Sequence, residues 1–142
     1  MGVVRTEITL VNIEDQGVAN RGYIPQDQVR QLTVSAVVDT GAWTGTKGPL
    51  VINEETREKL GLRIRKTNSG TLADGTKGEY SMAGPLEITW KDREAVCEAI
   101  VLPNAEEILL GAIPLEAMDL MVHPLKEEIV GAHGDQPLHV IY

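Results

Sequence analysis

The sequence predicts a single all-β domain, spanning residues 1–142, with one or two short helices. A chain of 142 residues is the usual size of one domain with one core, and it is long enough to fold without disulfides. It contains 14 valines, 11 isoleucines and 11 threonines, the β-branched residues that favour strands. Among them, 14 glycines and 7 prolines provide many turn positions.

Composition and charge exclude several classes of protein. With 42% hydrophobic and 24% charged residues, the chain is too apolar to remain disordered. Its net charge of −8 disfavours nucleic-acid binding, which requires a basic surface. No segment approaches the roughly 20 apolar residues of a membrane span, and the first residues lack the apolar run of a signal peptide. We therefore expect a cytoplasmic protein that binds neither nucleic acid nor membrane.

The first half of the chain alternates between strands and turns. Residues 3–13 alternate apolar and polar side chains, which predicts a strand. Residues 14–28 are expected to form a turn and irregular chain, and residues 29–38 a second strand. After a loop over residues 43–49 rich in Gly and Thr, a short strand is expected at residues 50–52.

Local signals then predict a helix and a hairpin. Asn53 can cap a helix over residues 54–60, and Gly61 can end it. The Asp74-Gly75 dipeptide predicts a tight hairpin between two strands. The second of these strands is expected to place five apolar residues on one face: Tyr80, Met82, Leu86, Ile88 and Trp90.

The second half continues the pattern. Lys91-Asp92 is expected to turn the chain into a strand over residues 93–102, in which Cys97 alternates with small apolar residues and reads as core packing. A short apolar strand follows at residues 108–111, and a helix is predicted from Pro114, with Leu115, Met118 and Leu120 facing the core. Residues 128–130 and 138–142 look like strands.

The segment Asp39-Thr40-Gly41-Ala42 is the most informative for function. An apolar strand leads directly into the Asp39 carboxyl, and Gly41 permits a tight turn after it. Taken alone, Asp-Thr-Gly is common in ordinary turns and indicates little more than a turn.

The order of the motifs is more specific. The Asp-Thr-Gly-Ala segment is followed by the strand at residues 50–52, a helix ending at Gly61, an Asp-Gly hairpin and Leu109-Leu110-Gly111 before a short helix. This order resembles the retropepsin-like aspartic proteases, in particular their prokaryotic members, over residues 29–130. The resemblance implies a closed-barrel-like acid-protease monomer that acts as an aspartic-type endopeptidase, a hydrolase of peptide bonds, without a cofactor.

The resemblance also implies roles for single residues. Asp39 matches the catalytic aspartate, Thr40 the residue that braces the two active-site loops, Gly41 the tight turn, and Ala42 a position lining the substrate cleft.

Two further segments match the family. Asp74, Gly75 and Thr76 match the tip of the flap that closes over a bound peptide. Leu110 and Gly111 match the apolar-glycine pair that supports the active-site loop.

One aspartate does not suffice for this chemistry, because hydrolysis needs an acid and a base together. The chain has a single Asp-Thr-Gly, so a two-fold homodimer is expected to bring two Asp39 side chains together. Two adjacent carboxyls share one proton and titrate as a pair. The expected partners are thus a second copy and a peptide or protein substrate.

Two observations leave alternatives open. Residues 43–49 are longer and bulkier than the family pattern, and Trp43 fits either a plug on the core or a substrate contact. The chain could therefore be a catalytically silent β-barrel module, for peptide binding or dimerisation, in which Asp39 is structural. A third reading is a monomeric β domain without a groove. No metal site is expected, because the three histidines, His123, His133 and His139, lack ligand spacing.

Overall fold

The computed structural model describes residues 3–39, 48–71, 77–123 and 125–134. Its strands are β1 (Arg5–Asn12), β2 (Gln31–Asp39), β3 (Leu50–Ile52), β4 (Ile64–Thr71), β5 (Lys77–Trp90), β6 (Arg93–Val101), β7 (Ile108–Gly111), β8 (Leu120–Val122) and β9 (Ile129–Gly131). Its helices are α1 (Ile13–Asn20), the 3₁₀ helix η1 (Gln26–Gln28), α2 (Glu54–Leu60) and α3 (Ala112–Ala117).

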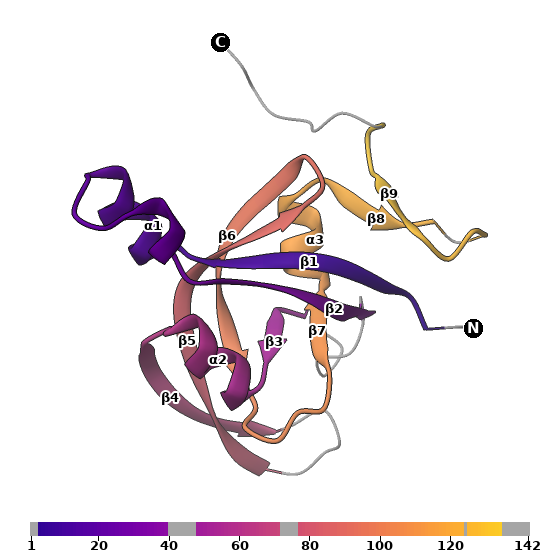
Figure 1. The fold of residues 1–142 in the computed structure, drawn as a ribbon. Helices are drawn as coiled ribbons and strands as arrows, with labels where there is room; N and C mark the ends of the chain where they lie inside the picture. Colours follow the sequence, from indigo (N-terminus) through magenta and orange to yellow (C-terminus); the bar gives the residue numbers. More distant parts are fainter. Residues whose placement is uncertain (1–2, 40–47, 72–76, 124, 135–142) are drawn as a thin grey trace.

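Six of these strands close into a barrel (Figure 1). Neighbouring strands follow the order β1-β2-β7-β3-β6-β5, and β5 pairs back with β1 to complete the ring. β4 extends the sheet by pairing with β5, while β8 and β9 form a separate two-stranded sheet. The prediction of an all-β, closed-barrel domain is confirmed, but the described residues form three short α-helices where one or two were predicted.

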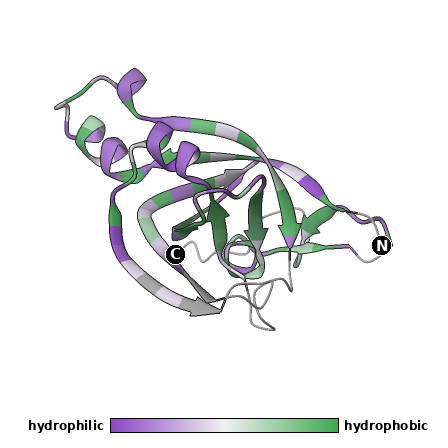
Figure 2. Ribbon diagram, turned by 90° about the horizontal axis from the view of Figure 1, so that it is seen from below, coloured by the Kyte–Doolittle hydropathy of each residue, from purple (hydrophilic) through white to green (hydrophobic). Residues whose placement is uncertain are grey.

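The core fills the barrel because alternate residues of each strand point inward. Ile8 and Leu10 of β1, Leu50 and Ile52 of β3, and Leu110 of β7 are at most 1% exposed. Figure 2 shows the hydrophobic colouring gathered on the central strands and hydrophilic stretches on the helices outside them. Burial of these side chains is the main stabilising contribution to the fold.

The alternation along β5 differs from the prediction. Ala83 of β5 pairs with Ala99 of β6, and the next pair is Leu86 with Cys97. Between these pairs β5 advances by three residues and β6 by two, so β5 contains a bulge. One extra residue moves the following side chains to the other face. Ala83 therefore shares the core face with Leu86, and the predicted common face that included Met82 is wrong.

The helix α1 corrects the expected turn at its position. Asn12, the last residue of β1, accepts a hydrogen bond from the Asp15 N–H at 3.0 Å and caps the helix. Gly17 in its middle lowers its intrinsic helix propensity, which obscures it in the sequence. α2, by contrast, has the predicted bounds, with Asn53 accepting from the Thr56 N–H at 2.8 Å and Gly61 in the left-handed region.

Asp15 makes the stability of α1 dependent on pH. The Arg30 Nε–H donates to Asp15 Oδ2 at 2.7 Å and Nη2–H donates to Oδ1 at 2.9 Å. These bonds hold the pKa of Asp15 below its ordinary value of 3.8. A depressed pKa gives stability that is present above the unfolded value and is lost as the pH falls through the folded value.

We therefore expect Asp15→Asn to lower the melting temperature at neutral pH and to have a smaller effect at strongly acidic pH. Asp27→Asn, in the exposed η1, is the control for loss of one negative charge. Melting curves between neutral and strongly acidic pH measure both variants. Equal destabilisation by Asp15→Asn at every pH would contradict the role of its ionised form.

Arg93 fastens the small β8–β9 sheet to the barrel. Its side chain is 2% exposed and donates to the carbonyls of Met118 at 3.2 Å, Asp119 at 2.6 Å and Gly134 at 2.8 Å. β8 begins directly after Asp119, so a residue of β6 fixes where α3 ends and the small sheet begins. The predicted helix therefore ends before Leu120, which is buried but belongs to β8.

We expect Arg93→Met to lower the free energy of unfolding by about 3 kcal/mol, because it leaves buried carbonyls and Asp119 without their cation. Arg65→Met is the control, since Arg65 forms an exposed ion pair with Glu98 and its loss should cost less than about 1 kcal/mol. Denaturant titrations measure both. Equal losses in the two variants would show that the three carbonyl bonds do not stabilise the fold.

Candidate active site

The catalytic candidate Asp39 lies at the carboxyl end of β2, beside the end of β7. The two strands run parallel, with Val38 opposite Leu110 and Asp39 opposite Gly111. Asp39 is half-buried, and Leu110 is fully buried in the core. The structure thus brings together three of the residues that the sequence singles out, although they come from opposite halves of the chain.

The position of β7 makes this neighbourhood possible. β7 lies between β2 and β3, which are consecutive strands in the sequence. It runs parallel to β2 and antiparallel to β3, where Leu50 lies opposite Leu110. A strand from the second half of the chain therefore supports both strands that flank the Asp-Thr-Gly segment.

Gly111 allows this close packing. Its N–H donates to the Pro49 carbonyl at 3.1 Å, and the Ile113 N–H donates to the Gly48 carbonyl at 3.0 Å. A Cβ at Gly111 would lie 2.2 Å from the Gly48 oxygen and 2.5 Å from the Pro49 oxygen. No other residue fits there without moving the backbone, and sequence reasoning gave no roles to Gly48 and Pro49.

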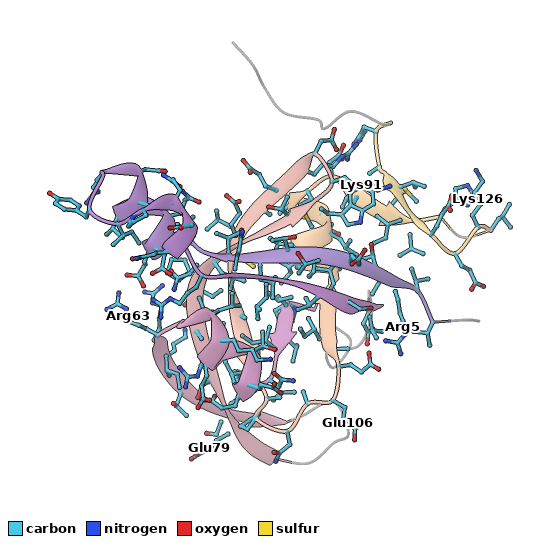
Figure 3. The ribbon with its side chains drawn as sticks, in the orientation of Figure 1. Arg5, Arg63, Glu79, Lys91, Glu106 and Lys126 are labelled. Carbon is cyan, nitrogen blue, oxygen red and sulfur yellow. The ribbon has the colours of Figure 1, made fainter. Side chains whose placement is uncertain are left out.

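An ion pair connects strands on both sides of β2. Arg5, labelled in Figure 3, is the first residue of β1 and lies opposite Val37 of β2. Its guanidinium donates to both carboxylate oxygens of Glu107, at 2.5 and 2.9 Å, just before β7. The pair raises the pKa of Arg5 and lowers that of Glu107. Both side chains are exposed, so the pair contributes little to global stability.

The expected flap is a hairpin formed by β4 and β5. The strands pair antiparallel up to Thr71 opposite Lys77, so the predicted strands on either side of the Asp-Gly turn are confirmed. Several predicted site residues lie outside the described residues: Thr40, Gly41, Ala42, Asp74, Gly75 and Thr76. Trp43 and the first residues of its loop also lie outside them.

Within the described residues, the other reactive groups offer no competing site. Cys97 packs against the core, and burial raises the pKa of its thiol to about 11, with Glu98 adding to the effect. A thiol with this pKa is protonated at neutral pH and is a poor nucleophile. His123 Nδ1 accepts from the Leu125 and Lys126 N–H groups. Over the described ranges, no three His, Cys, Asp or Glu residues gather as a metal site.

The helices carry no membrane-spanning segment: none within the described part of the chain combines the length and the apolarity needed to cross a bilayer.

Comparison with known proteins does not assign a family. No protein-family model matches the chain, and no curated protein is significantly similar to it in sequence.

Proposed function

We propose that this protein is a retropepsin-like aspartic endopeptidase that acts as a homodimer. The observation that carries the proposal is the parallel pairing of Asp39 with Gly111 at the ends of β2 and β7. This pairing places the Asp39 carboxyl beside Leu110 and Gly111, the apolar-glycine pair expected to support it. The closed barrel and the β4–β5 hairpin are two further features that such an enzyme would have.

The proposed mechanism uses the two Asp39 carboxyls at the dimer axis. The ionised carboxyl takes a proton from a water molecule that attacks the scissile carbonyl. The protonated carboxyl donates its proton to the carbonyl oxygen, which gives a gem-diol. The carboxyl that took the proton from water then passes it to the leaving amine as the C–N bond breaks, and a hydroxyl of the gem-diol returns a proton to the other carboxyl. Bonds and protons balance with water as the sole co-reactant, so no cofactor takes part. Thr40 would brace the two active-site loops against each other.

The proposed substrate is an extended peptide in the cytoplasm. Ala42 would line the cleft, and the flap tip at Asp74, Gly75 and Thr76 would cover the peptide. An extended peptide can bind there through backbone hydrogen bonds, as an added strand does. Closure of the flap would exclude water other than the nucleophile.

The alternative is the silent module, in which residues 43–49 fill the cleft and Asp39 is structural. Both proposals keep the barrel and a possible dimer interface, so they differ in catalysis rather than in fold. A cleavage assay therefore separates them.

The test is digestion of a denatured protein mixture by the purified protein at several pH values, with new termini identified by mass spectrometry. Wild type should generate cleavage sites that Asp39→Asn does not, and its solution mass should be that of a dimer. A strict monomer at micromolar concentration, or cleavage that persists in Asp39→Asn, would overturn the proposal.

A further inference from the structure

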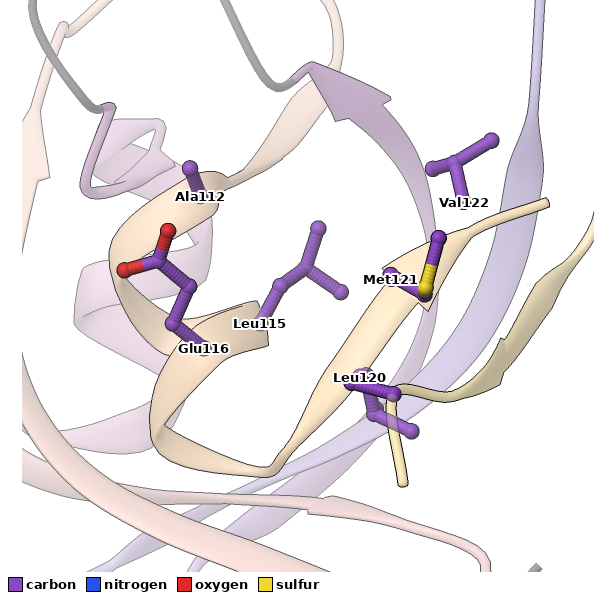
Figure 4. A pocket seen from close by; sticks show the side chains of 7 residues that line it. Ala112, Leu115, Glu116, Leu120, Met121 and Val122 are labelled. Carbon is purple, nitrogen blue, oxygen red and sulfur yellow. The ribbon is translucent and has the colours of Figure 1, made fainter. Parts of the chain in front are cut away.

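A small polar cavity lies between β9 and the turn that connects β5 to β6. It has a volume of about 250 Å³ and is lined by residues 90–93 and by all three residues of β9. Among the described residues, its lining includes none of β8, so the cavity lies on the β9 side of the ribbon. The apolar cavity between α3 and β8 (Figure 4) lies elsewhere, since it begins at Ala112, directly after Gly111, and adjoins the candidate site.

The polar cavity is remote from Asp39. Thr89, which directly precedes the lining residues, lies opposite Thr9 of β1, and Thr9 lies opposite Thr33 of β2. Asp39 follows Thr33 by six residues on the same strand, which corresponds to roughly 20 Å. A ligand in this cavity would therefore not touch the candidate catalytic residue.

Arg93 provides a buried cation in the lining. Its guanidinium packs against Gly131 of β9, where a Cβ would lie 2.5 Å from Nη2. Three carbonyls accept from Nη1 and Nη2, but the Nε–H has no hydrogen-bond partner among the described residues. Asp119, whose carboxylate lies 3.8 Å from Nη1, is not in the lining. A buried donor without an acceptor is costly, so this N–H favours a ligand that accepts a hydrogen bond.

Lys91 adds a second cation in an unfavourable backbone conformation. Its φ is 52°, in the left-handed region that glycine and asparagine adopt more readily than lysine. Its Nζ lies 4.6 Å from the centroid of the Trp90 ring, which also lines the cavity. Unfavourable backbone conformations of this kind are concentrated at binding sites. The ring also gives the cavity an apolar wall beside the positive charge.

The backbone of β9 provides further donors. The Ala132 N–H donates to the Asp119 carbonyl at 2.8 Å, so these two residues form a hydrogen-bonded pair of the antiparallel ribbon. Hydrogen-bonded and non-hydrogen-bonded pairs alternate, so the next pair, Leu120 with Gly131, is of the second kind. The N–H of Gly131 therefore points away from β8, and so does that of Ile129, two residues earlier. Both lie on the side of the ribbon that carries the cavity.

We propose that this cavity binds a small organic anion, whose carboxylate or phosphate oxygens accept hydrogen bonds from Arg93, Lys91 and the β9 backbone. An ionised oxygen group accepts hydrogen bonds without donating any, which fits a lining rich in donors. The lining has two cations against one acidic residue, Asp92, whereas the whole chain has a net charge of −8. Because the volume lies below the range of pockets for drug-sized ligands, the anion has few carbon atoms. The proposal concerns no residue of the candidate active site and is independent of the protease proposal.

NMR titrations of the full chain with succinate, with inorganic phosphate and with neutral succinamide test the proposal. The readouts are the Arg93 Nε–H and the Trp90 indole N–H, and the amides of β4 serve as reference signals. At least one anion should shift both readouts to saturation with a Kd of about 1 mM or below, and succinamide should not. The anion that binds more tightly identifies the carboxylate or the phosphate as the natural group. No saturable shift with either anion, or equal binding of succinamide, would overturn the proposal.

Two lysine variants test the position of the site. Lys91→Asn removes the ammonium and keeps a residue that tolerates the left-handed backbone, so it should weaken anion binding at least about tenfold. Lys126→Asn removes the same charge at the tip of the β8–β9 ribbon, where Figure 3 labels Lys126, and should bind as the wild type does. Equal weakening in both variants would indicate an effect of net charge alone. That result, or wild-type affinity in Lys91→Asn, would overturn the assignment of this cavity as the anion site.

Discussion

Replacing Asp39 by asparagine should lower peptide cleavage by at least about a thousandfold and leave the barrel folded. Asparagine has almost the same volume as aspartate, but it neither takes a proton from water nor donates one as an acid. Asp39 stands at the half-buried end of β2, so the substitution leaves the core of the barrel intact. Circular dichroism and solution mass would show the retained fold and dimer, and peptide cleavage would show the loss.

The pH dependence of wild-type cleavage provides a second measurement. The proposed mechanism requires one proton shared by two Asp39 carboxyls, so the rate should fall on both the acidic and the basic side of an optimum. The two limbs belong to the pair rather than to either residue. A cleavage rate that is independent of pH would contradict the shared proton.

The enzyme and the silent module predict opposite changes in stability for Asp39→Asn. In the proposed dimer, two carboxyls on the axis would repel each other at neutral pH and two amides would not, so Asp39→Asn should stabilise that dimer. A structural Asp39 that accepts backbone hydrogen bonds would lose stability on substitution at every pH. Melting temperatures of both proteins at neutral and acidic pH distinguish these cases. Destabilisation at every pH, with cleavage that never depended on Asp39, would favour the silent module.

Local signals in the sequence predicted the elements whose determinants are local. Asn53 and Gly61 define the ends of α2, because a cap and a left-handed glycine act within one turn of the helix. The Lys91-Asp92 turn likewise lies where a turn between β5 and β6 was expected, with Lys91 at a φ of 52°.

Features that depend on distant contacts were not predictable in this way. The bulge in β5 moves Met82 off the core face, and only the register with β6 reveals it. The helix α1 depends on Asp15 bonding to Arg30, a residue that lies beyond the helix and η1. A single sequence does not show that Asp15 and Arg30 meet, so the segment between them reads as irregular.

The candidate site likewise contains residues that the sequence predicted and residues that it did not. Asp39, Leu110 and Gly111 were found through the order of motifs, and the pairing of β2 with β7 places them together. Gly48 and Pro49 were missed as contacts of Gly111, because their carbonyls matter only once β7 has entered between β2 and β3.

Among substitutions that add one methyl group near the site, Gly111→Ala should destabilise the protein most. The new Cβ would lie 2.2 Å from the Gly48 oxygen, and this neighbour is backbone that no rotamer change can move. Gly111 has a φ of −83°, which alanine adopts without strain, so the cost is steric alone. We expect the free energy of unfolding to fall by about 3 kcal/mol.

Gly17→Ala is the matched control, because a Cβ at Gly17 in α1 meets nothing within 4 Å. Both substitutions reduce the freedom of the unfolded chain equally, so they differ only in the space available in the folded protein. Gly17→Ala should raise stability by about 0.5–1 kcal/mol. Denaturant titrations of the two variants measure the difference directly.

Gly111→Ala should also lower cleavage by about a hundredfold under conditions where it remains folded, because β7 must shift and Asp39 pairs with its last residue. Gly17→Ala should cleave at the wild-type rate. Full activity in a destabilised Gly111→Ala would show that the end of β7 stabilises the barrel without positioning Asp39. Asp39 would then owe its position to the segment that follows β2, and the proposed support by Leu110 and Gly111 would be wrong.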